Sequence, residues 1–120
     1  MTMKKKRLII NTATVIKRMN GNQFLIKELY RIYLEQINEY IQNIQESFVN
    51  RDFNQISDYC HSLETCLQSV GADRCEDTNN TLSYQIKTGK INSVSDTIDE
   101  LIKEFNILFL KYNDTNFETK

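Results

Sequence analysis

The scarcity of chain-breaking residues is the feature that most restricts the fold of this chain. Its 120 residues include no proline and only three glycines. Strand-rich folds need a turn about every 8–12 residues and usually mark it with glycine or proline. Long helices joined by few turns are therefore favoured, and a chain of this length suits one domain with one hydrophobic core.

Charge is distributed unevenly along the chain. The formal net charge is only −1, from 15 basic and 16 acidic residues. Residues 1–20 nevertheless form a basic segment, whose positive side chains are Lys4, Lys5, Lys6, Arg7, Lys17 and Arg18. Such a short run is typical of a solvated chain end, although basic runs also bind nucleic acid or acidic membranes. The remainder is acidic, which argues against a nucleic-acid surface.

The sequence gives no sign of membrane insertion or of a metal site. No segment approaches the roughly 18 consecutive apolar residues of a membrane span. The apolar run after the basic residues, Leu8 to Ile10, is too short for a secretion signal. The cysteines Cys60, Cys66 and Cys75 lack the paired spacing of a zinc site. We expect a cytoplasmic, monomeric protein with reduced thiols.

Apolar periodicity predicts a long helix after Asn22, which is placed to cap it. Apolar residues recur at intervals of three or four, a spacing that returns to one face of a helix. They are Ile26, Leu29, Tyr33, Ile37, Tyr40, Ile44 and Phe48, with Leu25, Ile32 and Ile41 widening the stripe. A stripe this wide indicates a helix that packs against more than one neighbour. The pattern stops near Asn50.

Three more helical runs follow, over about 52–70, 73–88 and 93–112. Asp52 is placed to cap the first of them, and Gly89 to end the second in a left-handed conformation. Short joints make sequential helices antiparallel neighbours. We therefore expect an all-α fold, an antiparallel up-down-up-down four-helix bundle over about 22–112. A short N-terminal helix near 12–19 would precede it, and a polar tail, 113–120, would follow.

The chain has one histidine, His61, midway along the second of these main helices. The apolar line of that helix passes through Ile56 and Leu63, and His61 lies off it. The same-face neighbours of His61 are polar. They are Ser57, Asp58, Glu64 and Thr65, with Gln68 further along. An exposed imidazole is predicted, and on spacing alone a surface histidine without a function is the simpler interpretation.

The sequence around His61 adds a second kind of information. Residues 61–72 read H-S-L-E-T-C-L-Q-S-V-G-A. This stretch resembles the signature of the histidine-containing phosphotransfer (HPt) family, H-x-L-K-G-small-small-x-x-hydrophobic-G-A. The matching positions are His61, Leu63, Cys66, Val70, Gly71 and Ala72. The helix layout is also similar, so the resemblance covers about 22–112 and implies that 1–120 is a single HPt-like domain.

The resemblance implies a phosphoryl carrier rather than an enzyme. His61 would accept a phosphoryl group from the aspartyl phosphate of one response-regulator receiver and pass it to another. The implied partners are receivers and a sensor or hybrid histidine kinase, and magnesium would belong to the receiver, with no cofactor on this chain. The neutral imidazole is a good nucleophile near neutral pH. The phosphohistidine surroundings and docking face would comprise Ser57, Asp58, Glu64, Thr65 and Gln68, and docking would use apolar and small side chains beside His61.

Two positions depart from the family pattern and support other interpretations. Glu64 stands where the family usually has lysine, and Thr65 stands where it prefers glycine. A like charge beside the phosphate disfavours the phosphorylated form. These departures support a degenerate HPt-like module that binds a receiver or kinase without being phosphorylated. A third interpretation is an unrelated helical adaptor in which His61 has no role.

Overall fold

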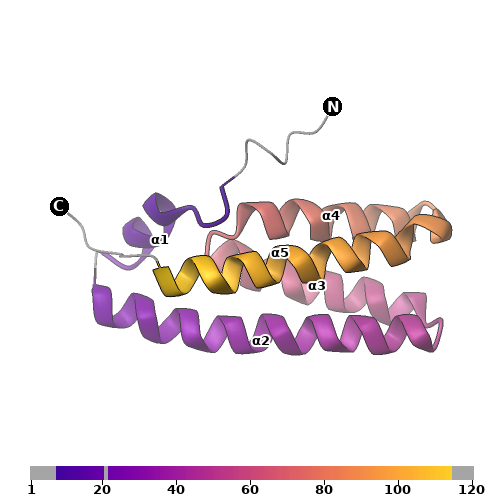
Figure 1. Ribbon diagram of the computed structural model, residues 1–120, viewed down its shortest axis with the longest axis horizontal. Coiled ribbons are helices and arrows are strands. Elements are labelled where there is room, and N and C mark those ends of the chain that lie inside the picture. Colours follow the sequence, from indigo (N-terminus) through magenta and orange to yellow (C-terminus); the bar gives the residue numbers. More distant parts are fainter. Residues whose placement is uncertain (1–7, 21, 115–120) are drawn as a thin grey trace.

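The computed structural model describes residues 8–20 and 22–114, and these are helical apart from their joints, with no strand among them (Figure 1). The basic run Lys4 to Arg7 and most of the predicted polar tail lie outside the described residues. The elements are α1 (Thr12–Arg18), α2 (Gln23–Val49), α3 (Phe53–Ser69), α4 (Asp73–Lys87), the short 3-10 helix η2 (Ile91–Ser93) and α5 (Val94–Asp114).

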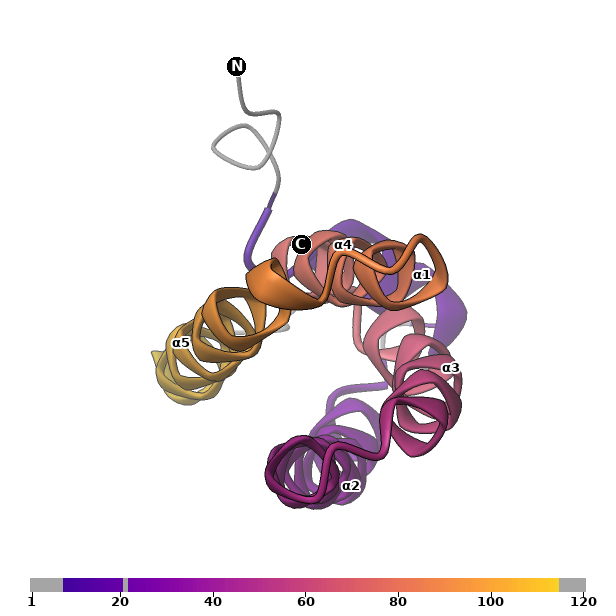
Figure 2. The same cartoon turned by 90° about the vertical axis from the view of Figure 1, so that its right-hand side faces the viewer.

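The helices pack lengthwise into a bundle. Figure 2, which views the bundle nearly end-on, shows α2, α3, α4 and α5 next to one another in chain order. In that order each helix contacts the next, and α5 also contacts α2. The short helix α1 lies at the same end of the bundle as the start of α2 (Figure 1). The expected all-helical bundle with a short N-terminal helix is confirmed.

The buried face of α2 is rotated from the predicted one. Its buried residues are Ile26, Tyr30, Leu34, Ile37, Ile41, Ile44 and Ser47. Leu25 and Ile32, which were expected to widen the buried stripe, are 41% and 42% exposed. The prediction was wrong here because the apolar stripe of α2 is wider than the face that its neighbours cover. The helices that pack on α2 therefore select which part of the stripe is buried.

The helix ends follow the predicted local chemistry. The side-chain oxygen of Asn22 accepts a hydrogen bond from Leu25 N at 3.0 Å, and Asp52 Oδ1 accepts one from Gln55 N at 3.1 Å. Both predicted N-caps are therefore confirmed. Gly89 has φ +74°, the expected left-handed conformation. The last helix begins at Val94, after the 3-10 turn, which is one residue later than the predicted start near residue 93.

The segment before α1 is attached to the joint between α3 and α4. Asn11 N donates to Gly71 O at 2.7 Å, and Arg74 N donates to Leu8 O at 3.1 Å. Gly71 has φ +65°, and a Cβ there would lie 2.9 Å from Asn11 O. A side chain at position 71 would clash with the backbone oxygen of Asn11, and it would also be strained by the positive φ angle. Glycine at this joint lets the N-terminal segment fix the end of α3.

A buried ion pair joins α4 to α5. Arg74 Nη2 lies 3.0 Å from Glu104 Oε2, and the side chains are 27% and 2% exposed. A carboxylate this deeply buried is tolerated only while it keeps its partner. This pair therefore ties α5 to the helix that carries one side of the candidate site.

We predict that Arg74→Leu lowers the free energy of unfolding by about 2–3 kcal/mol, because it leaves Glu104 buried without its cation. The value lies below that of a fully buried pair because Arg74 is 27% exposed. The double variant Arg74→Leu/Glu104→Leu should regain most of the loss. Urea denaturation measures all three proteins.

The control is Arg31→Leu, which removes the pair between Arg31 and Glu35, 3.1 Å apart and 58% and 68% exposed. Exposed pairs contribute little, so its effect should stay below about 1 kcal/mol. Equal losses for Arg31→Leu and Arg74→Leu would contradict a stabilising role of the buried pair.

Candidate functional site

His61 lies midway along α3 and is exposed, as its position off the apolar line predicted. The opposite side of α3 is buried through Ile56, Cys60, Leu63, Cys66 and Leu67. These side chains enter the core, so α3 is held by its apolar face while the imidazole remains open to solvent. A nucleophile on this helix is therefore accessible, and the backbone that carries it is held in place by the buried face.

Two side-chain hydrogen bonds hold α4 against the helix of His61. Asn79 Nδ2 donates to the carbonyl oxygen of Cys60 at 2.9 Å, and Gln68 Nε2 donates to Glu76 Oε2 at 2.9 Å. Asn79 is only 1% exposed. Because Cys60 immediately precedes His61, the buried bond from Asn79 fixes the α3 backbone at the imidazole.

An open hollow of about 650 Å³ lies between α3 and α4 beside His61. The α3 residues that line it are Ser57, Asp58, Cys60, His61, Ser62 and Glu64, and those from α4 are Asn79, Asn80, Ser83, Tyr84 and Lys87. Three predicted neighbours of His61, namely Ser57, Asp58 and Glu64, are thus brought together with it. The site is formed by α3 and α4, whereas the sequence analysis assigned site residues on α3 alone.

Thr65 and Gln68 do not line this hollow. Both are exposed and lie further along α3. Gln68 is engaged with Glu76, and the Thr65 carbonyl accepts from Ser69 Oγ at 2.9 Å. These two residues border the site towards the α3–α4 joint.

The surroundings of His61 are more polar than expected. The one large exposed apolar side chain among the lining residues is Tyr84, which is 57% exposed. Lys90 Nζ lies 5.3 Å from the centre of its ring. We expected docking to use apolar side chains beside His61. Among the described residues that line the hollow, the Tyr84 ring is the one large exposed apolar group that could serve this purpose.

The contribution of α4 was the part of the site that the sequence analysis did not assign. Asn79 gave a visible signal, because a polar residue occupies an apolar position of its helix. Nothing in the sequence marks Tyr84 or Lys87 as neighbours of His61. Their positions depend on how α4 is aligned along α3, which local periodicity does not specify.

The cysteine next to His61 is chemically shielded. Cys60 is 1% exposed, and burial raises the pKa of its thiol to about 12. Burial also raises the pKa of Cys66. The thiolate is the reactive form of cysteine, so both thiols are poor nucleophiles at neutral pH. His61 is the accessible nucleophile of this pair of adjacent residues.

The described part of the chain contains neither a cluster of three metal-ligand residues nor a membrane-spanning helix. Within residues 8–20 and 22–114, no three or more His, Cys, Asp or Glu side chains are grouped so that they could hold a metal ion. In the same residues, every helix is too short or too polar to serve as a membrane span. The lining of the hollow provides one imidazole, the charged side chains of Asp58, Glu64 and Lys87, and several neutral hydrogen-bonding groups.

Comparisons with models of protein families, with curated proteins and with solved structures found no match to this chain. The function is therefore inferred from its own residues. The features that a function must explain are the exposed imidazole of His61, the polar hollow beside it and the buried side-chain amide of Asn79.

We predict that native protein at pH 8 does not react with iodoacetamide, because all three thiols are buried. Unfolding in urea should expose them and add three adducts, counted by mass spectrometry. Because the pKa of Cys60 rises from 9.0 to about 12 on folding, its neutral thiol stabilises the fold below pH 9. That contribution is lost as the pH rises towards 12. Rapid alkylation of Cys60 in folded protein would contradict its burial.

Proposed function

We propose that this protein is a histidine phosphotransfer protein in a two-component phosphorelay. His61 would accept a phosphoryl group from the aspartyl phosphate of one receiver domain and pass it to another. The observation that carries the proposal is the exposed imidazole of His61 midway along a helix whose other face is buried. The HPt-like sequence of residues 61–72 supports the same function.

The transfer needs little chemistry from this chain. A lone pair of the imidazole forms a P–N bond as the P–O bond to the receiver aspartate breaks, and the electron pair returns to the aspartate carboxylate. The same exchange in reverse loads the next receiver. Positioning of the two groups in line supplies most of the acceleration in such transfers. A rigid helix that presents an exposed nitrogen beside a face on which the receiver docks would meet this requirement.

The packing of α3 and α4 supports the up-down-up-down arrangement in which the imidazole would face outward. Residue 60 of α3 pairs with residue 79 of α4, whereas residue 68 pairs with residue 76. The partner on α4 has a lower residue number when the residue on α3 has a higher one, which is the pattern of helices that run in opposite directions. The joints 50–52 and 70–72 are short enough for such neighbours.

The charges around His61 affect how stable a phosphohistidine would be. Asp58 and Glu64 line the hollow with it, and both disfavour an added negative charge. Lys87 is the one basic residue among the described lining residues, and it reaches the hollow from the last turn of α4. Lys87 would offset part of the phosphoryl charge, in place of a basic residue on α3.

Glu64 favours a second candidate function. A carboxylate in the lining of the hollow suits a module that binds a receiver without being phosphorylated. Such a module would keep the docking face and lose the transfer. The two functions differ in whether a covalent P–N bond ever forms at His61.

We predict that receiver domains phosphorylated with acetyl phosphate and magnesium transfer their label to this protein. The label should be lost in acid and kept in alkali, as a P–N bond requires. The variant His61→Gln should accept no label while its circular dichroism spectrum remains helical. Labelling that survives His61→Gln would refute the mechanism, and docking without any transfer would establish the non-phosphorylated module instead.

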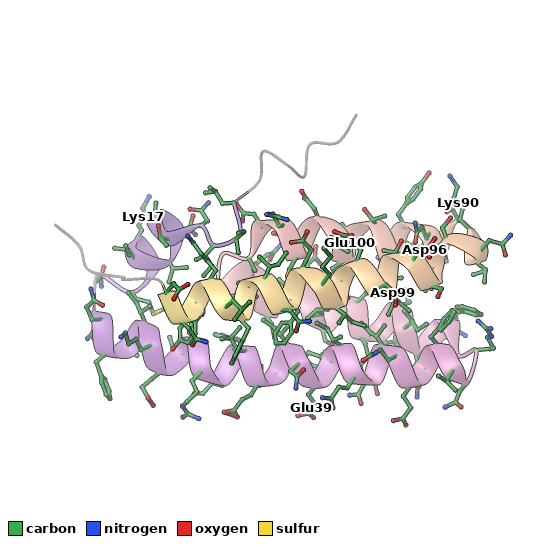
Figure 3. All side chains as sticks on the ribbon, viewed as in Figure 1. Lys17, Glu39, Lys90, Asp96, Asp99 and Glu100 are labelled. Carbon is green, nitrogen blue, oxygen red and sulfur yellow. The ribbon has the colours of Figure 1, made fainter. Side chains whose placement is uncertain are left out.

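We also predict that Glu64→Gln speeds direct phosphorylation of His61 by phosphoramidate, a small anionic phosphoryl donor. Removal of one like charge about 6 Å away lowers the barrier by about 0.7 kcal/mol or more, which is at least about threefold in rate. Phosphorus NMR follows the reaction. Glu39→Gln is the control, because Glu39 is exposed and points away from the bundle on α2 (Figure 3). Equal rates for the two variants would show that Glu64 does not oppose the reaction.

A further inference from the structure

Asn79, which lines the hollow beside His61, carries a buried acceptor that is not used within the described residues. Asn79 is 1% exposed, and its Oδ1 has no hydrogen-bond partner there. Its Nδ2 is already committed to the carbonyl of Cys60, which fixes the orientation of the amide. Buried polar atoms without partners are rare and unfavourable. A hydrogen-bond donor that reached this atom would satisfy it.

The charged residues of the hollow favour a donor that carries positive charge. Asp58 and Glu64 line it, and among the ion pairs of the described residues neither carboxylate takes part. Lys87 balances only one of the two charges. The lining therefore has one uncompensated negative charge beside an unpartnered amide oxygen. The negative charge would be neutralised by a cation, and the amide oxygen would accept a hydrogen bond from its N–H group.

We propose that the hollow receives a lysine or arginine side chain of the receiver that docks over His61. The identity of the partner rests on the proposed function, whereas the cationic chemistry rests on the hollow itself. The N–H groups of the cation would donate to Asn79 Oδ1 and to the carboxylates of Asp58 and Glu64.

This assignment gives Glu64 a positive role in the transfer. The carboxylates would bind the partner's cation in the complex, and that cation would then lie beside His61 when the phosphoryl group arrives. The partner would supply positive charge that α3 lacks. Receivers with a neutral or acidic residue at the matching position would bind more weakly, so the hollow would select among receivers.

The test uses N-acetyl-arginine amide as the probe and N-acetyl-citrulline amide as its neutral counterpart of nearly the same shape. Each is titrated into the full-length protein labelled with nitrogen-15. The arginine probe should cause saturable shifts of the Asn79 side-chain amide and of the α3 backbone near His61. Citrulline amide should cause none. Absence of saturable arginine shifts, or equal shifts with citrulline, would overturn the proposal.

Variants with the arginine probe test which residues form the site. Glu64→Gln should weaken binding about three- to fivefold, the effect of one partly exposed ion pair. Glu39→Gln, the exposed control on α2, should leave binding unchanged. Asn79→Leu removes the buried acceptor at similar volume and should also weaken binding, with thermal unfolding as the check that it folds. Undiminished binding in Glu64→Gln would place the cation elsewhere and overturn the proposal.

This test is independent of phosphorylation. Arginine binding without any receiver transfer would support the hollow as a cation site and refute the phosphotransfer function. Transfer to His61 without arginine binding would refute the cation site and leave the phosphotransfer function intact.

Discussion

The buried hydrogen bond from Asn79 to the Cys60 carbonyl is the contact on which the candidate site depends. It joins α4 to α3 at the residue before His61, inside a core where both partners are nearly inaccessible. Apolar packing alone would hold α3 against α4 without specifying its position along the helix axis. A directional bond in a low-dielectric interior adds that specificity. The imidazole, the polar hollow and the α4 residues that line it are aligned as a consequence.

The sequence predicted those features that local periodicity and capping determine. The exposure of His61 followed from its position off the apolar line of α3, and the starts of α2 and α3 followed from Asn22 and Asp52. The buried face of α2 was predicted less well, because Tyr30 and Leu34 are buried by neighbours that the local pattern does not reveal. When an apolar stripe is wider than the area that the neighbours cover, the sequence does not show which part of the stripe is buried.

The α4 half of the hollow could not be predicted for a related reason. Tyr84 and Lys87 reach the site only through the alignment of two helices, which nonlocal packing sets. Asn79 was noticeable as a polar residue at an apolar position, and the structure accounts for half of its chemistry, since its amide nitrogen binds Cys60. The amide oxygen of Asn79 has no hydrogen-bond partner among the described residues, and this is why we propose a donor from a docked partner.

The central proposal is that the face formed by α3 and α4, rather than the imidazole alone, would let this protein accept a phosphoryl group. Single-turnover transfer from a phosphorylated receiver tests it when the histidine is moved to exposed position 45 of α2, as His61→Gln/Gln45→His. The account predicts transfer to the natural protein and none to the relocated histidine. Equal rates for both proteins would contradict it, because any exposed imidazole would then serve.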